Sequence, residues 1–174
     1  HDRMQRQLTT LQRLLDRQTR AGHLIVDDDV RAAAGAIRKY FDEAASRHHR
    51  DEEQDLFPAV IEAMAGSDAV CLHAIVRRLS ADHRQLEQAW QDLRPNLIAL
   101  AQRGRGDGAG DNGAAEVTAG TAVTAVADRD PPALDPVKVE RFIAAHRSHL
   151  DIGNAELIPM ARRLLSDHHV ALIG

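Results

Sequence analysis

The sequence predicts an all-α protein, an antiparallel up-down bundle of four long helices within a single domain of residues 1–174. Apolar residues recur at spacings of three and four in four long segments, which is the period of one helix face. No segment alternates apolar and polar residues as a strand does. The first three segments are joined by short connections, which favour antiparallel neighbours.

The first two helices are separated by a short break. The first begins at or before His1 and ends at Arg20-Ala21-Gly22, with an apolar face made of Met4, Leu8, Leu11 and Leu15. Asp27, Asp28 and Asp29 then offer an N-cap and first-turn acids for the second helix, which continues to about Met64. Because the sequence starts inside a helix without an initiator Met, we expect a trimmed N-terminus, which leaves room for a short targeting segment upstream.

The third and fourth helices are separated by a long segment of different composition. The third helix follows the turn Gly66-Ser67-Asp68 and fades near Leu100. Residues 104–132 are rich in Gly and Ala, and we interpret them as a flexible insertion rather than a functional lid. Asp135 then provides an N-cap and Pro136 the first residue of the fourth helix.

Composition excludes several classes of partner. Net charge is −4 with acids and bases interspersed, and no basic stripe is present, so we expect no nucleic-acid partner. No apolar run reaches the roughly 20 residues of a membrane span, so we expect no membrane partner. The single cysteine, Cys71, fits a reducing compartment, and we therefore expect a cytoplasmic protein.

Histidine is abundant, with ten residues, and each predicted helix turns at least one of them toward the core. On the second helix His48 and Glu52 are four residues apart and therefore share a face. A buried polar group without a partner costs roughly 1–3 kcal/mol, and a cation would provide a partner for all of these groups at once. The pattern predicts a metal site with the ligands His1, His48, Glu52, His83 and His149. Imidazole and carboxylate donors suit Fe, Mn or Zn better than Mg or Ca.

Two segments carry a resemblance to a known family. His48-His49-Arg50-Asp51-Glu52-Glu53-Gln54-Asp55-Leu56-Phe57-Pro58 resembles the signature of the hemerythrin-like, HHE cation-binding family, and the segment from His149 to Pro159 resembles its second copy. The His1 start and the Asp82-His83 step fit the same order of motifs. The resemblance implies a four-helix bundle around a non-haem, usually di-iron, site. It also implies binding of dioxygen, nitric oxide or peroxide, sensing of iron or oxygen, or repair of iron centres.

One position departs from that pattern. The family has an acid four residues after His149, and this sequence has Gly153. A bridging carboxylate is therefore missing, which puts a second metal in doubt and predicts an open or substituted coordination position on the fourth helix. Five nearby groups are candidates to compensate, and we expect each to support the ligands rather than to bind metal: His146 and Glu87, ranked first, then Glu156, His49 and Glu53.

Three hypotheses of function follow. We favour a protein that binds iron, as one or two ions, together with a small diatomic ligand or peroxide, and Mn or Zn in place of iron remains open. The second hypothesis is a di-iron enzyme that consumes peroxide or another small oxidant. The third is a degenerate bundle with an interaction role and partial or no metal, for which Gly153 is the best support.

Overall fold

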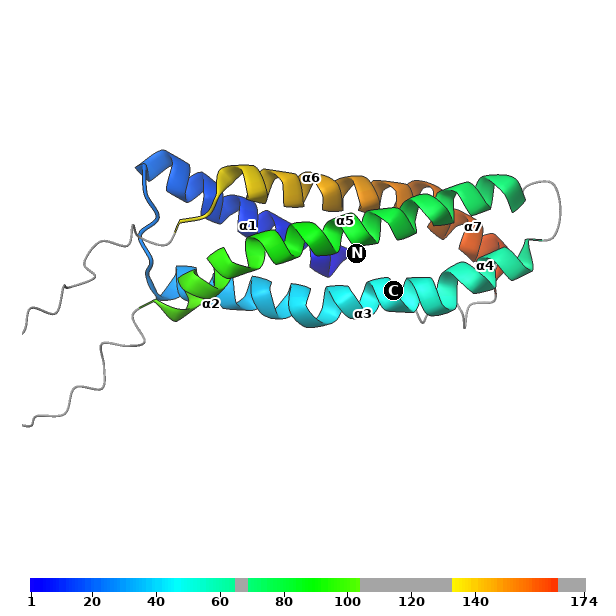
Figure 1. Ribbon diagram of the computed structural model, residues 1–174, viewed down its shortest axis with the longest axis horizontal. Coiled ribbons are helices and arrows are strands. Elements are labelled where there is room, and N and C mark those ends of the chain that lie inside the picture. The colour runs from blue at the N-terminus through cyan, green and yellow to red at the C-terminus, as the bar shows by residue number, and fades with distance from the viewer. Residues whose placement is uncertain (65–68, 104–132, 166–174) are drawn as a thin grey trace, which may run out of the picture.

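The computed structural model describes residues 1–64, 69–103 and 133–165. Within these ranges all regular structure is helical, and the elements join into four long helices that lie side by side (Figure 1). Successive long helices run in opposite directions along the long axis of the molecule (Figure 1). The predicted all-α bundle is confirmed, whereas the predicted insertion at about 104–132 lies outside the described residues.

The first long helix is α1 (Asp2–Ala21), and it ends at Gly22, whose φ of 74° is a conformation that glycine adopts without strain. The second begins after Asp27, whose carboxylate accepts a hydrogen bond from the backbone N–H of Val30 at 2.9 Å. It comprises α2 (Asp28–Lys39), η1 (Tyr40–Ala45), α3 (Ser46–Asp51), η2 (Glu52–Leu56) and α4 (Phe57–Ala63). The expected Asp cap and the expected end near Met64 are both observed.

The third long helix is α5 (Ala69–Gln102), and the fourth comprises α6 (Pro136–Ile152), η3 (Gly153–Leu157) and α7 (Ile158–Leu164). Asp135 caps α6 by accepting hydrogen bonds from the two N–H groups of Val137 and Lys138. Helix α1 packs on α2 and α6, and α5 packs on the same two helices, which closes the bundle into a ring of four. Within the described parts of the chain, none of these helices is both long and apolar enough to cross a membrane.

Three wide π-helical turns interrupt the second and fourth long helices. Two of them, η2 and η3, have matching positions: each starts four residues after a histidine, at Glu52 and at Gly153. Each is followed by a proline at the second residue of the next α-helix. Proline has no N–H and clashes with the carbonyl four residues earlier, and a wider turn is compatible with both constraints. The spacing of apolar residues predicted the long helices but gave no indication of these local changes of period.

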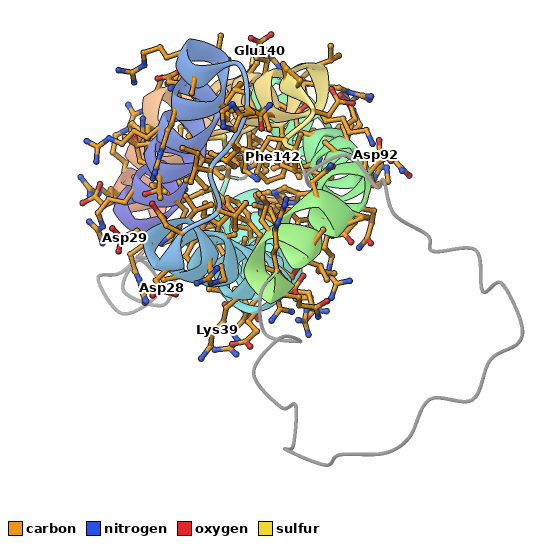
Figure 2. All side chains as sticks on the ribbon, turned by 90° about the vertical axis from the view of Figure 1, so that its left-hand side faces the viewer. Asp28, Asp29, Lys39, Asp92, Glu140 and Phe142 are labelled. Atoms are coloured by element: carbon orange, nitrogen blue, oxygen red, sulfur yellow. The ribbon has the colours of Figure 1, made fainter. Side chains whose placement is uncertain are left out.

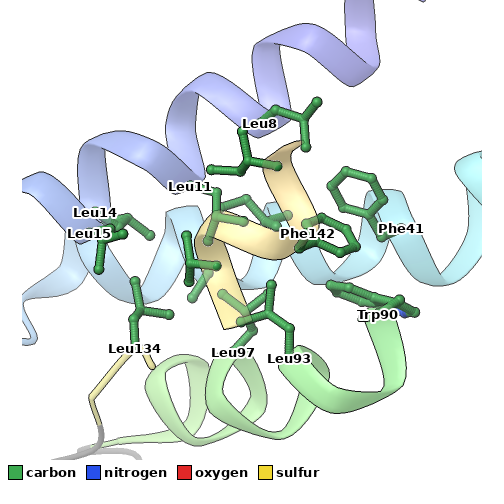
Figure 3. Packing of buried hydrophobic residues seen from close by; sticks show 14 of the residues in the cluster. Leu8, Leu11, Leu14, Leu15, Phe41, Trp90, Leu93, Leu97, Leu134 and Phe142 are labelled. Carbon is green, nitrogen blue, oxygen red and sulfur yellow. The ribbon is translucent and has the colours of Figure 1, made fainter. Parts of the chain in front are cut away.

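Buried apolar side chains form two clusters, one toward each end of the bundle. The larger cluster contains Phe41, Trp90 and Phe142, whose rings pack at centroid distances of 4.9–5.6 Å (Figure 3). In the end-on view Phe142 lies in the interior, whereas charged residues such as Lys39 and Glu140 point outward (Figure 2). The smaller cluster includes Leu56, Leu72 and Leu157. Between the two clusters, the bundle interior holds a band of buried polar side chains.

Candidate metal centre

The band of buried polar side chains is centred on the carboxylate of Glu52, which is only 2% exposed. One carboxylate oxygen, Oε1, lies 3.4 Å from His48 Nε2 and 3.9 Å from His1 Nε2. The other, Oε2, lies 3.1 Å from His83 Nε2 and 3.8 Å from His149 Nε2. These four imidazoles come from all four long helices, His1 being the N-cap residue of α1.

Two of the imidazoles have a hydrogen-bond acceptor beside Nδ1, the ring nitrogen on the side away from Glu52. His83 Nδ1 lies 2.8 Å from Glu53 Oε1, and His1 Nδ1 lies 2.7 Å from Asn154 Oδ1. With Nδ1 as the donor in each case, Nε2 is the ring nitrogen that faces Glu52, and it can bind a cation once it has lost its proton. Ligating histidines in proteins are commonly oriented by such a hydrogen bond on the other ring nitrogen.

The side chains fall into two groups whose potential ligand atoms lie within 4.8 Å of one another. The first group contains His1, His48 and Glu52, and the second contains His49, His83 and His149. Glu52 lies between the groups, with one oxygen toward each. Among the described residues, three buried ring nitrogens have no hydrogen-bond partner: His48 Nε2, His49 Nε2 and His149 Nδ1.

Protonation in this centre is set by burial and by Glu52. Burial lowers the pKa of His149 to about 3 and that of His49 to about 2, and it also lowers the pKa of His48. Burial acts to raise the pKa of Glu52, but the hydrogen bond from His83 and the neighbouring imidazoles of His1, His48 and His149 hold it well below its usual range. At neutral pH Glu52 is therefore an anion, and most of the surrounding imidazoles are neutral.

His1 and His83 titrate in the opposite direction. The carboxylate of Glu52 raises the pKa of His1. Burial acts to lower the pKa of His83, but the carboxylates of Glu52 and Glu53 outweigh it and raise this pKa. When no cation is bound, the negative charge of the carboxylate beside each ring favours the protonated form of that imidazole.

This donor set fits a transition-metal ion. Neutral imidazole nitrogens and an ionised carboxylate are the protonation states that metal binding requires, and both are present here at neutral pH. Cations bound at the two groups would provide partners for unpartnered ring nitrogens and would compensate the buried charge of Glu52, each of which is costly when left alone. Nitrogen and oxygen donors in this ratio suit Fe, Mn or Zn.

The family model of the hemerythrin HHE cation-binding domain matches residues 1–161 of this chain. The chain belongs to the hemerythrin HHE family. Neither the curated proteins nor the solved structures that were searched gave a match. Membership in the HHE family and the buried cluster of histidines around Glu52 together indicate cation binding.

The position that departs from the HHE pattern is close to His1. Gly153 is buried, and a Cβ atom at this position would lie 3.4 Å from His1 Cε1, an ordinary van der Waals distance. The His1 imidazole therefore lies directly beside the residue that replaces the expected acid. The prediction of an open or substituted coordination position at Gly153 stays a prediction.

The five secondary candidates have different environments. His146 is buried, and its Nδ1 donates a hydrogen bond to the carbonyl of Phe142 at 3.0 Å, but it belongs to neither ligand group. Glu53 is half-exposed and holds His83. Glu87 is exposed and accepts a hydrogen bond from Gln91. Glu156 is exposed because the wide turn of η3 rotates it away from the face of His149.

His49, ranked below His146 and Glu87 from the sequence, belongs to a ligand group with His83 and His149, and its ring stacks on that of His83 at 4.2 Å. Asn154 was not predicted at all. The sequence offered one signal for it, namely an amide directly after the anomalous Gly153. Its contact with His1 joins residues 153 positions apart in the chain, so no local period could reveal it.

Proposed function

We propose that this HHE protein binds non-haem iron, as one or two ions, and uses it to bind a small oxidant such as O₂, NO or peroxide. The residues that would hold the metal are His1, His48, Glu52, His83 and His149. The observation that carries the proposal is a buried anionic carboxylate with an imidazole nitrogen from each long helix within 4 Å. We choose iron over Mn or Zn because of the family resemblance, and metal analysis distinguishes the three.

Bound iron would supply reversible redox chemistry and an electrophilic position for a small ligand. The chain's own residues do the rest of the work. Glu53 and Asn154 orient the imidazoles of His83 and His1 through their Nδ1 atoms. The two apolar clusters limit water on either side of the polar band, and the ring of Phe57 stacks on that of His83 at 5.9 Å.

Access for a small molecule is consistent with this proposal. A surface hollow of about 480 Å³ opens beside His1 and His48, and Tyr40 and Asn154 contribute to its wall. A second hollow, of about 320 Å³, opens beside His49 and His83. A larger hollow between α2 and α5, of about 680 Å³, contains none of the candidate ligands. The two hollows that touch the centre are large enough to admit a diatomic ligand or peroxide.

The direct test is metal analysis of the purified chain after expression in iron-replete medium and after anaerobic loading with Fe(II), Mn(II) or Zn(II). We expect about one to two equivalents of iron per chain, and a higher melting temperature when the metal is bound, because a ligand of the native state stabilises it. Less than about a tenth of an equivalent of every metal, with an unchanged melting temperature, would favour the metal-free interaction module instead.

The chain offers a matched control for this test. Glu52 and Glu87 each lie four residues after a histidine, but Glu52 is buried among the imidazoles and Glu87 is exposed. We expect E52Q to lose most of the bound metal and E87Q to retain it. Equal metal content in the two variants would exclude Glu52 as a ligand. Catalytic consumption of peroxide by the iron-loaded protein would support the enzyme alternative.

A further inference from the structure

Two consecutive histidines of α3 face different neighbours in the bundle interior. Successive residues of an α-helix point about 100° apart, and the rings of His48 and His49 are 5.9 Å apart. His48 faces the ring of His1, with a centroid distance of 5.2 Å. His49 faces α5 and α6 instead: its ring lies 4.2 Å from that of His83 and 5.5 Å from that of His149.

The Nε2 atom of His49 is buried and has no hydrogen-bond partner among the described residues. His146, in the same bundle, is an example of a buried histidine whose ring has a backbone hydrogen-bond partner. Its Nδ1 bonds the carbonyl of Phe142, one turn earlier on its own helix. A buried imidazole nitrogen without a partner costs roughly 1–3 kcal/mol. His49 lacks the kind of partner that His146 has, and the side chains nearest to it include two other histidines.

We propose that His49 is itself a metal ligand, and that with His83 and His149 it forms a second half-site, joined through Glu52 to the half-site of His1 and His48. This inference rests on the proposed metal-binding function and assigns the ligands within it. The three histidines have ring nitrogens within 4.8 Å of one another and come from three different long helices. Two nitrogens bound at about 2.1 Å to one ion lie at most about 4.2 Å apart, so small side-chain rotations bring them to bonding distance.

The split of the Glu52 carboxylate supports two half-sites. Oε1 faces His1 and His48, while Oε2 faces His83 and His149. A carboxylate in this position can bridge two ions about 3.5–4 Å apart. With His49 the second half-site has three nitrogen donors, so the chain can bind two ions with a single bridging carboxylate.

The test compares two leucine variants, H49L and H146L, by the number of Zn(II) and Fe(II) ions bound per chain. Both histidines lie beside a candidate ligand, but only His49 belongs to a ligand group. We expect about two equivalents for the wild-type chain and for H146L, and about one for H49L. In crystals of H49L, an anomalous-scattering map should still show the metal peak beside His48 but should lack the peak beside His83 and His149.

Two outcomes would overturn the inference while leaving the proposed function intact. One is H49L binding as many ions as the wild-type chain with unchanged affinity. The other is a wild-type map in which no metal lies within bonding distance of His49. Absence of metal from the wild-type chain overturns the proposed function itself. Far-UV circular dichroism monitors folding, and if H49L does not fold, H49Q provides the same comparison with a side chain of similar polarity.

Discussion

Glu52 and Asn154 show how single side chains set the chemistry of this bundle. Glu52 places a negative charge in the interior, which stabilises nearby cations, whether these are protons on imidazoles or a metal ion. Asn154 acts on the centre indirectly, because its side chain accepts a hydrogen bond from the Nδ1 atom of His1. The two residues therefore have separable roles: Glu52 is a candidate ligand, and Asn154 positions a candidate ligand.

Replacing Asn154 tests its positioning role. We expect N154L to weaken metal binding roughly 10–100-fold, because outer partners of ligating histidines typically contribute this much to affinity. N154D should restore binding, since its carboxylate again accepts from His1 Nδ1. The measurement is competition with a chromophoric chelator. The control is E156L, whose exposed side chain lies in the same turn, η3. Equal affinities of N154L and N154D would contradict the role.

At the scale of elements, the wide turn η1 is tied to α5 by one carboxylate. Asp42 accepts hydrogen bonds from Trp90 Nε1 at 3.0 Å and from Arg94 Nε at 2.8 Å. Arg38, one turn earlier, adds a contact at 3.2 Å. Partial burial acts to raise the pKa of Asp42, but these donors outweigh it and lower the pKa. The cluster fixes the register of the second and third long helices on the side of the metal centre where Phe41 and Trp90 pack.

Removing that carboxylate should destabilise the fold. We expect D42A to lower the free energy of unfolding by about 1–3 kcal/mol, because it leaves the Trp90 N–H and the Arg94 guanidinium without their acceptor. Urea denaturation followed by circular dichroism measures the change. The control is D16A, which removes an exposed acid whose side chain, among the described residues, bonds only Gln12, and it should change stability by less than about 0.5 kcal/mol. A D42A effect no larger than that of D16A would show that the cluster is not a structural tie.

For the whole molecule, the polar band between two apolar clusters makes stability depend on pH when no metal is bound. Burial lowers the pKa of His146 to about 4 and that of His149 to about 3. Between these values and about 6.5, the unfolded chain binds protons that the folded chain does not, so acid favours unfolding. The lowered pKa values of His48 and His49 act in the same direction. The raised pKa values of His1 and His83 oppose them only in part.

We therefore expect the metal-free protein to be less stable at about pH 5 than at about pH 7.5, with His146 alone contributing roughly 2 kcal/mol. Urea denaturation in the presence of a chelator measures this difference. H146L should reduce the pH dependence, whereas H23Q, at an exposed position, should leave it unchanged. A metal-free protein that is equally stable or more stable at the lower pH would contradict the predicted neutral burial of these imidazoles.

Much of this molecule follows from local sequence patterns. The 3.6-residue period identified the four long helices and placed His48, Glu52, His83 and His149 on interior faces. The caps at Asp27 and Asp135 followed from residue types alone. The hemerythrin-like resemblance, confirmed by the family match, extended these expectations to the class of site. The helical period, the caps and the motif each depend on residues only a few positions apart, so each can be recognised within one segment of the chain.

Contacts between segments that are distant in the sequence could be established only from the tertiary structure. The wide turns η2 and η3 shift the helical period, so Glu156 lies at the surface although its spacing from His149 placed it inside. Asn154 contacts His1, which is 153 positions away in the sequence. His49 lies close to His83 and His149, and the three residues come from three different long helices. Such contacts are fixed by the distance and rotation between helices, which arise from packing of whole side-chain layers. Local sequence patterns therefore placed most of the interior residues, and the packing of the four helices established which of them lie together around Glu52.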